Sequence, residues 1–185
     1  MTARGLILYG PPAAGKDTVT RALQELGDYR LFSRLKVGAG KSEGYRMGTS
    51  QQLADLEAAG DVIYQNSRYG NTYVIDRPGM DVAFEAGTPI VHLGQIDGIA
   101  ALVAGYPADW AVVLLWCGRE VTAARSAGRE DIDTEARVRA WDATHADVES
   151  HPDQAWDLSV DTSTVEPAAA ARLIDALLSA GGQRR

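Results

Sequence analysis

The fold is decided near the start of this 185-residue chain, by Gly5-Leu6-Ile7-Leu8-Tyr9-Gly10-Pro11-Pro12-Ala13-Ala14-Gly15-Lys16-Asp17-Thr18. Residues 5–9 are an apolar run that predicts a buried strand, and the glycines and prolines after it predict a sharp turn. From Lys16 to Leu26 apolar residues recur at helical spacing, and Gly27 ends the segment. Gly-x-x-x-x-Gly-Lys between a buried strand and a helix is the pattern of a phosphate-binding loop, or P-loop.

This loop has the residue types that phosphate binding requires. Glycine lets backbone N–H groups turn toward a polyphosphate where a side chain would collide. The helix that follows directs its positive end at the anion. We therefore expect Lys16 to carry positive charge to the β- and γ-phosphates of ATP. The residues predicted to bind the phosphates of ATP are Gly10, Pro11, Pro12, Ala13, Ala14, Gly15, Lys16, Asp17 and Thr18.

The residue after the lysine departs from the usual Ser or Thr: it is Asp17, and Thr18 follows. Two interpretations remain open. Either Thr18 supplies the hydroxyl near phosphate or magnesium, or Asp17 acts through a metal-bound water. Lys-Asp-Thr resembles the same run in some small-molecule and nucleotide kinases. Mg²⁺ is therefore the expected cofactor beside ATP, with Thr18 as its candidate ligand.

Strands and helices are predicted to alternate along the rest of the chain, which indicates an α/β fold with a mostly parallel central sheet. The further predicted strands are Tyr29–Lys36, Asp61–Gln65, Thr72–Ile75, Pro89–Leu93, Trp110–Cys117 and Asp157–Val160. The further predicted helices are one capped by Ser50 and running to Ala59, one capped by Asp76 with Pro78 in its first turn, a short one ending at Ala104, Glu120–Ala127, Thr134–Glu149 and Pro167–Leu178. Residues 37–48 hold four glycines and are expected to form a loop.

Composition narrows the classes of partner. The formal net charge is −7, so DNA, RNA and anionic membranes are unfavourable partners, whereas a small anionic ligand could still bind where basic residues converge. The single cysteine, Cys117, lies in an apolar run and is expected in the core. The longest apolar run is far too short to span a membrane, and a cytoplasmic location is expected.

Over most of its length the chain resembles the guanylate kinase family of nucleoside monophosphate kinases, with several landmarks in family order between Tyr45 and Gly98. Tyr45, and Tyr73 in the run Gly70-Asn71-Thr72-Tyr73, match two tyrosines that hold the acceptor's phosphate in that family. Arg34 and Lys36 lie where the family has a pair of arginines that grip the same phosphate, with Lys41 or Arg46 as alternatives. Each tyrosine alone could equally be a packing residue with a satisfied hydroxyl.

The resemblance also implies a lid. Arg125, Arg129 and Arg137 surround a charged segment like the family's lid, whose arginines clamp the transferring phosphoryl group. Arg125 is assigned to ATP, while Lys16, Arg129 and Arg137 are the expected catalytic residues. Taken alone, the stretch 125–139 would more often be a solvated helix face. Residues 161–163 resemble the loop that borders the donor's adenine.

The implied architecture is a single three-layer P-loop NTPase domain over residues 1–185. It would have a core of residues 1–32 and 76–180, a small acceptor-binding insert at about 33–75, and a short lid at about 128–139. The implied activity is transfer of the γ-phosphoryl group of ATP to a small phosphorylated acceptor, foremost a nucleoside monophosphate. A sugar-phosphate or modified-nucleotide kinase, a weak nucleotide-binding module and a hydrolytic switch are the alternatives; retention of Lys16 argues against the module.

The chain departs from the family where guanine is read. Tyr64 stands in place of a glutamate that pairs with the guanine edge, and Leu93-Gly94-Gln95 replaces an Asp-x-Asp run. Tyr64 is still assigned to the acceptor site, and Gln65 or Asp97 could supply the missing contact. The loop also resembles that of kinases forming ribose 1,5-bisphosphate, whose acceptor has no base. We therefore predict that GMP is not strongly preferred.

Overall fold

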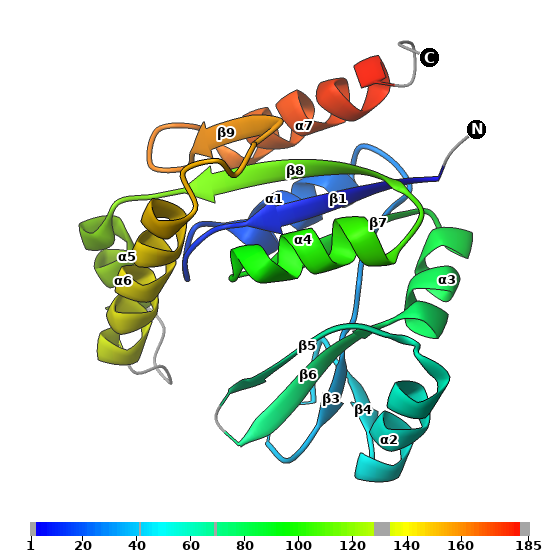
Figure 1. The fold of residues 1–185 in the computed structure, drawn as a ribbon. Coiled ribbons are helices and arrows are strands. Elements are labelled where there is room, and N and C mark those ends of the chain that lie inside the picture. Colours follow the sequence, from blue (N-terminus) through cyan, green and yellow to red (C-terminus); the bar gives the residue numbers. More distant parts are fainter. Residues whose placement is uncertain (1–2, 41, 69, 128–133, 182–185) are drawn as a thin grey trace.

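The computed structural model describes residues 3–40, 42–68, 70–127 and 134–181 (Figure 1). Its central sheet has the strand order β2-β7-β1-β8-β9, and all four pairings are parallel, so the predicted α/β class is confirmed. The strands are β1 (Arg4–Tyr9), β2 (Tyr29–Leu31), β7 (Thr88–Leu93), β8 (Asp109–Trp116) and β9 (Leu158–Asp161). Within the described ranges, no helix combines the length and the apolar character needed to cross a bilayer.

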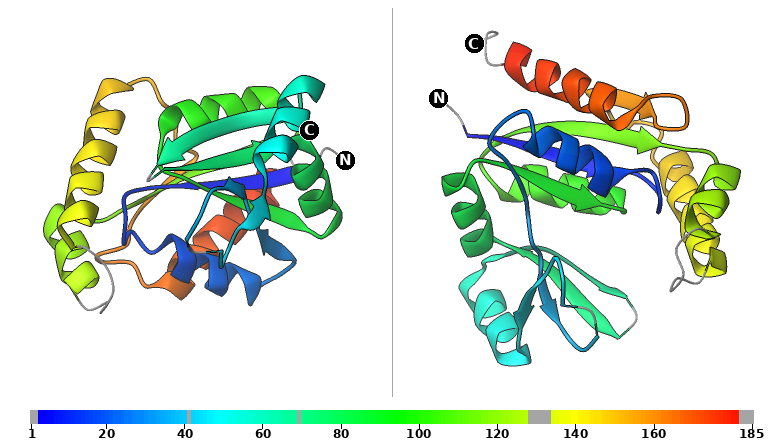
Figure 2. Two further views of the ribbon diagram at one scale, coloured as in Figure 1. Left: turned by 90° about the horizontal axis from the view of Figure 1, so that it is seen from below. Right: turned by 180° about the vertical axis from the view of Figure 1, so that it is seen from behind.

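Helices cover both faces of the central sheet, which explains why β1 is apolar at consecutive positions. Leu6 and Leu8 pack in one core cluster with α1 (Lys16–Gln24) and α7 (Pro167–Gly181). Ile7 and Tyr9 point to the other face, in a cluster with α3 (Arg77–Glu85) and α4 (Ile96–Gly105). In the rear view of Figure 2, α1 lies in front of the sheet and α4 behind it.

A second sheet lies below the central sheet in Figure 1, with the order β4-β3-β6-β5. Its strands are β3 (Leu35–Val37), β4 (Arg46–Gly48), β5 (Val62–Arg68) and β6 (Asn71–Asp76). The helix α2 (Ser50–Ala59) lies between β4 and β5 in the chain. Thr49 rather than Ser50 caps α2, through a capping box with Gln52.

The prediction of one strand over Tyr29–Lys36 is wrong. The strand breaks after Leu31, because β2 pairs with β7 in the central sheet whereas β3 pairs with β4 and β6 in the second. The chain changes sheets between these two pairings, and an apolar pattern does not show which partner a strand takes. The predicted loop 37–48 was also too long, since β4 occupies its end.

Asp76 joins the two sheets. It lies at the end of β6 and caps α3 as predicted, with its Oδ1 accepting a hydrogen bond from Gly79 N at 2.8 Å. Its carboxylate is almost fully buried and forms an ion pair with Arg46 on β4. One side chain thus fixes the start of a core helix and a strand of the second sheet.

The helical pair α5 (Arg119–Ala127) and α6 (Thr134–Ser150) stands at one side of the central sheet (Figure 1). The buried Tyr9 hydroxyl donates to Asp147 Oδ2 on α6 at 2.7 Å. The same carboxylate oxygen accepts from Ile96 N, the first residue of α4, at 2.8 Å. Burial and Asp147 both raise the pKa of Tyr9, so its proton stays in this bond. These bonds attach the second half of α6 to the core.

Candidate functional site

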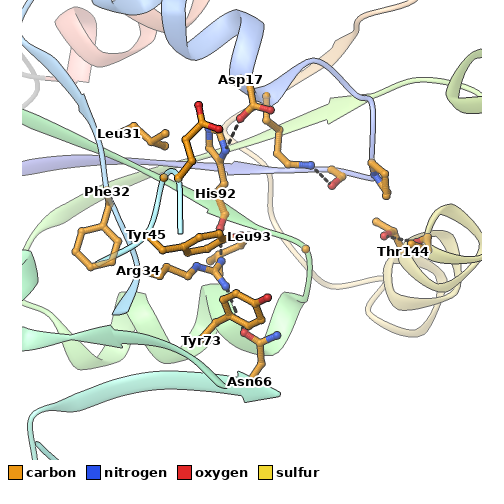
Figure 3. A pocket seen from close by; sticks show the side chains of 17 residues that line it. Asp17, Leu31, Phe32, Arg34, Tyr45, Asn66, Tyr73, His92, Leu93 and Thr144 are labelled. Atoms are coloured by element: carbon orange, nitrogen blue, oxygen red, sulfur yellow. Dashed lines mark hydrogen bonds and ion pairs between the residues drawn. The ribbon is translucent and has the colours of Figure 1, made fainter. Parts of the chain in front are cut away.

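A cavity of about 680 Å³ opens at the carboxyl ends of β1, β2 and β7 and faces the second sheet (Figure 3). This volume is in the usual range for small-molecule sites, and the end of a parallel sheet is the usual place. The described lining residues come from the P-loop, the β2–β3 connection, the segment before β4, β5, β6, the end of β7, and α6.

The P-loop folds back on itself between β1 and α1. Gly10, Ala13 and Gly15 have positive φ angles of 156°, 60° and 85°. A Cβ atom at Gly10 would collide with the backbone carbonyl of Leu115 on β8, so only glycine fits there. Ala13 is the one non-glycine residue with positive φ in the described ranges, a conformation that costs energy and concentrates at functional sites.

Lys16 lies at the start of α1 and spans the loop. Its Nζ donates to the carbonyl oxygens of Gly10 at 2.6 Å and Pro11 at 2.9 Å. Burial, helped by the charges of Arg34 and Arg137 and opposed by Asp17 and Cys117, lowers the pKa of Lys16 to about 8. No side chain caps the N-terminus of α1, so its first amides remain available to an anion.

Asp17 and His92 meet at the cavity wall. Asp17 Oδ1 lies 3.6 Å from His92 Nδ1, and His92 Nε2 lies 2.8 Å from the Thr20 hydroxyl. Burial, with Lys16 and Arg34 nearby, lowers the pKa of His92 to about 4, so the imidazole is neutral at pH 7. The structure places His92 in the lining of the cavity.

Arg34 connects the two sides of the cavity. Its guanidinium donates to the backbone carbonyl of His92 on β7 and to Asn66 Oδ1 on β5 at 3.3 Å. Tyr45 and Tyr73 also line the cavity, with ring centroids 5.3 Å apart. Asn66 was not anticipated, because nothing in the sequence distinguishes it from other polar residues of a strand. The predicted residues Arg34, Tyr45 and Tyr73 do come together.

Lys36, the other basic residue assigned to the acceptor, does not line the cavity. It is almost fully buried, with its Nζ donating to Ala39 O at 2.7 Å and lying 5.6 Å from the ring centre of Tyr45 and 6.0 Å from that of Tyr73. Its charge therefore lies near the two rings. Arg46 pairs with Asp76 rather than facing the cavity, and Lys41 lies outside the described residues.

The structure describes some of the residues that were assigned to the ATP site and to the lid. Arg125 donates to Ala13 O in the P-loop at 3.0 Å and to Thr162 O at 2.6 Å, which ties the loop to the segment after β9. Arg137 on α6 is close enough to affect the pKa of Lys16. Arg129 and segment 128–133 lie outside the described residues. Of the two residues after Lys16, Asp17 lines the cavity and Thr18 does not.

Tyr64 lies beside the cavity and is not part of its described lining. Its hydroxyl donates to Gln95 Oε1 at 2.7 Å, and burial raises the pKa of Tyr64, so the phenol keeps its proton. Gln65 points to the opposite face of β5, where it donates to Glu57 on α2 at 3.1 Å. The Asp97 carboxylate lies 3.8 Å from His151. Gln65 therefore faces away from Tyr64, whereas Asp97 is close enough to raise the pKa of Tyr64 but is largely exposed.

Comparison with known proteins agrees with this fold. No family model matches the chain. The guanylate kinase of Anaeromyxobacter dehalogenans is 28% identical over 141 residues, which are 72% of this chain and 62% of that protein. The crystal structure of guanylate kinase from Anaplasma phagocytophilum covers 99% of this chain, and 88% of its own, with a TM-score of 0.67 and 15% identity. The chain thus spans about three fifths of the curated relative, and the predicted resemblance to guanylate kinases is confirmed.

Proposed function

We propose that this protein is an ATP-dependent phosphotransferase that moves the γ-phosphoryl group of ATP to a small phosphorylated acceptor. The resemblance to guanylate kinases supports a nucleoside monophosphate as that acceptor. One observation carries the proposal: the P-loop with Lys16, and the group of Arg34, Tyr45 and Tyr73, face the same cavity. A donor phosphate and an acceptor phosphate held by these two groups would meet inside it.

The donor would bind at the P-loop. Its phosphates would take up the free amides at the start of α1 and would draw Lys16 Nζ from the Gly10 and Pro11 carbonyls. A nearby phosphate stabilises the charged form of a lysine, so binding would reverse the lowered pKa of Lys16. Arg125 would hold the loop in shape from behind, through Ala13 O.

Transfer would depend on alignment and charge. Phosphoryl transfer needs little covalent chemistry from the protein, and cations spread over the equatorial oxygens stabilise its transition state. Arg34 and Arg137 are near enough to Lys16 to lower its pKa, so these three cations would surround the transferred group. Arginine suits the position because its planar fork can pair with two phosphate oxygens.

The residues present also fit a magnesium ion shared with the nucleotide. In the described part of the chain, no three His, Cys, Asp or Glu side chains converge on one point, so the ligands would come largely from phosphates and water. Asp17 offers a largely exposed carboxylate beside Lys16 on the cavity wall, the hard oxygen that Mg²⁺ prefers. When bound, the ion would neutralise phosphate charge. Asp17 thus fits this role better than Thr18.

The test is a screen of nucleoside monophosphates and sugar phosphates with ATP and magnesium, following ADP formation and identifying products by ³¹P NMR. The proposal expects ADP formation that depends on one class of phosphorylated acceptor. ADP released equally without any acceptor would instead indicate a hydrolytic switch. ATP binding without turnover on any acceptor would indicate a binding module.

A further inference from the structure

Tyr64 fills the corner of the molecule between β5 and the start of α4. A Cβ atom placed on Gly98 would lie only 3.0 Å from Tyr64 Cε1 and 2.9 Å from Leu93 Cδ2, so both side chains pack against the Gly98 backbone. The Tyr64 hydroxyl closes the corner by its bond to Gln95, the N-cap residue of α4. The corner is therefore filled by the Tyr64 ring and by a hydroxyl whose hydrogen bond is already made to Gln95.

The cavity beside that corner is rich in hydrogen-bond donors. Arg34 has only N–H donors and no acceptor capacity, and Asn66 adds two amide N–H donors while its Oδ1 already accepts one bond from Arg34. Tyr45 and Tyr73 add hydroxyl groups. Such a set suits the oxygens of a phosphate. It does not suit the edge of guanine, which presents two N–H donors together.

The carboxylates of the described cavity lining are Asp17, on the P-loop helix, and Glu43, two residues before Tyr45. Asp97 and Asp147 lie nearer the corner, close enough to raise the pKa of Tyr64.

Neither of these two is a buried carboxylate awaiting a partner. Asp97 is 87% exposed and lies 3.8 Å from His151, and Asp147 accepts hydrogen bonds from the Tyr9 hydroxyl and from Ile96 N. A site that reads guanine rejects other bases because a buried carboxylate would be left unpaired, and such an unpaired group is not found among these residues.

We infer that this site selects its acceptor by the phosphate and not by the nucleobase, and that Tyr64 is the residue that determines this. The inference rests on the proposed phosphotransferase function. Nucleoside monophosphates with different bases then bind through the same phosphate contacts, and the base lies outside the closed corner. Contacts to the nucleobase then contribute little to the stabilisation of the transition state.

The first experiment measures kcat/KM for GMP, AMP, CMP, UMP and ribose 5-phosphate at saturating ATP and magnesium. We expect values for the four nucleotides within about tenfold of one another. A preference for GMP of about a hundredfold, or about 2.7 kcal/mol, overturns the inference while the proposed function stands. Loss of that preference in Glu43→Gln would then show that the loop before Tyr45 reads guanine. If no phosphorylated acceptor reacts, the proposed function itself fails.

The second experiment places a carboxylate at the corner. Tyr64→Glu is expected to raise the GMP-to-AMP ratio of kcat/KM at least tenfold, whereas Tyr64→Phe, which keeps the ring, leaves the ratio unchanged. Ser67→Glu on the same strand is the matched control, because residue 67 points to the face of β5 opposite residue 64. Folding is checked by thermal unfolding. An unchanged ratio in a folded Tyr64→Glu variant, or an equal rise in Ser67→Glu, overturns the role of Tyr64.

Discussion

Lys16 donates to two carbonyl groups of its own loop, and under the proposed function a bound phosphate would replace them. Lys16→Ala should lower kcat for phosphoryl transfer by at least about a hundredfold, because it removes a preorganised positive charge. The thermal unfolding midpoint should not fall, since the lysine serves the ligand rather than the core. Transfer at the wild-type rate would contradict the assignment of the P-loop.

The same residue gives the donor site a pH dependence. Because burial lowers the pKa of Lys16 to about 8, the free protein loses this charge as the pH rises through that value. ATP affinity should therefore fall between pH 7 and 9.5, measured by titration calorimetry. Lys16→Ala should bind ATP weakly and with no such slope. An equal slope in both proteins would assign the titration to another group.

Single residues also show where sequence reasoning ends. Gly10, Gly15 and Lys16 could be predicted because a short motif fixes their roles in a local turn. His92 and Asn66 could not, because their importance comes from meeting Arg34 across two different sheets. The spacing of residues along the sequence does not predict these contacts with Arg34.

Among the elements, the junction of β6 with α3 depends on Asp76. Asp76→Ala should lower the free energy of unfolding by about 3 kcal/mol, because it removes a helix cap and leaves Arg46 without its partner. Asp76→Asn keeps the capping oxygen and should cost less. Chemical denaturation measures both. Equal losses in the two variants would show that the ion pair, and not the cap, stabilises this junction.

The helix α6 brings Arg137 toward the donor site. Arg137→Ala should lower kcat at least about tenfold with little change in KM for ATP, because its charge acts mainly on the transition state. Arg139→Ala is the matched control: Arg139 is on the same helix and pairs with Glu135 at 3.5 Å on its exposed surface. Equal effects of the two variants would indicate a solvated helix face, and a change in ATP affinity alone would contradict the catalytic role.

Elements were predicted well where their own residues define them. The end of α2 and the cap of α3 agree with the sequence, because Gly60 and Asp76 mark them. The break after Leu31 was missed, because the residues there are as compatible with one long strand as with two short ones. Strand pairing decides between these alternatives, and pairing is a tertiary property.

For the whole molecule, the alternation of strands and helices was sufficient to predict a parallel sheet covered on both faces. It was not sufficient to predict the cavity, whose described lining joins residues as far apart in sequence as Gly10 and Thr144. The net charge of the chain likewise does not predict where its basic residues lie. The chain carries a formal charge of −7, yet Lys16, Arg34 and Arg137 gather at one place.

The bond from Tyr9 to Asp147 couples α6 to the P-loop through the chain itself, because Tyr9 is the residue directly before Gly10. The same helix is held at two further points: Trp141 donates to Cys117 O at 2.9 Å, just after β8, and Asp142 pairs with Arg119 on α5. A shift of the P-loop would therefore reach α6 directly through β1, whereas the contacts to β8 and α5 would resist a tilt of the helix as a whole.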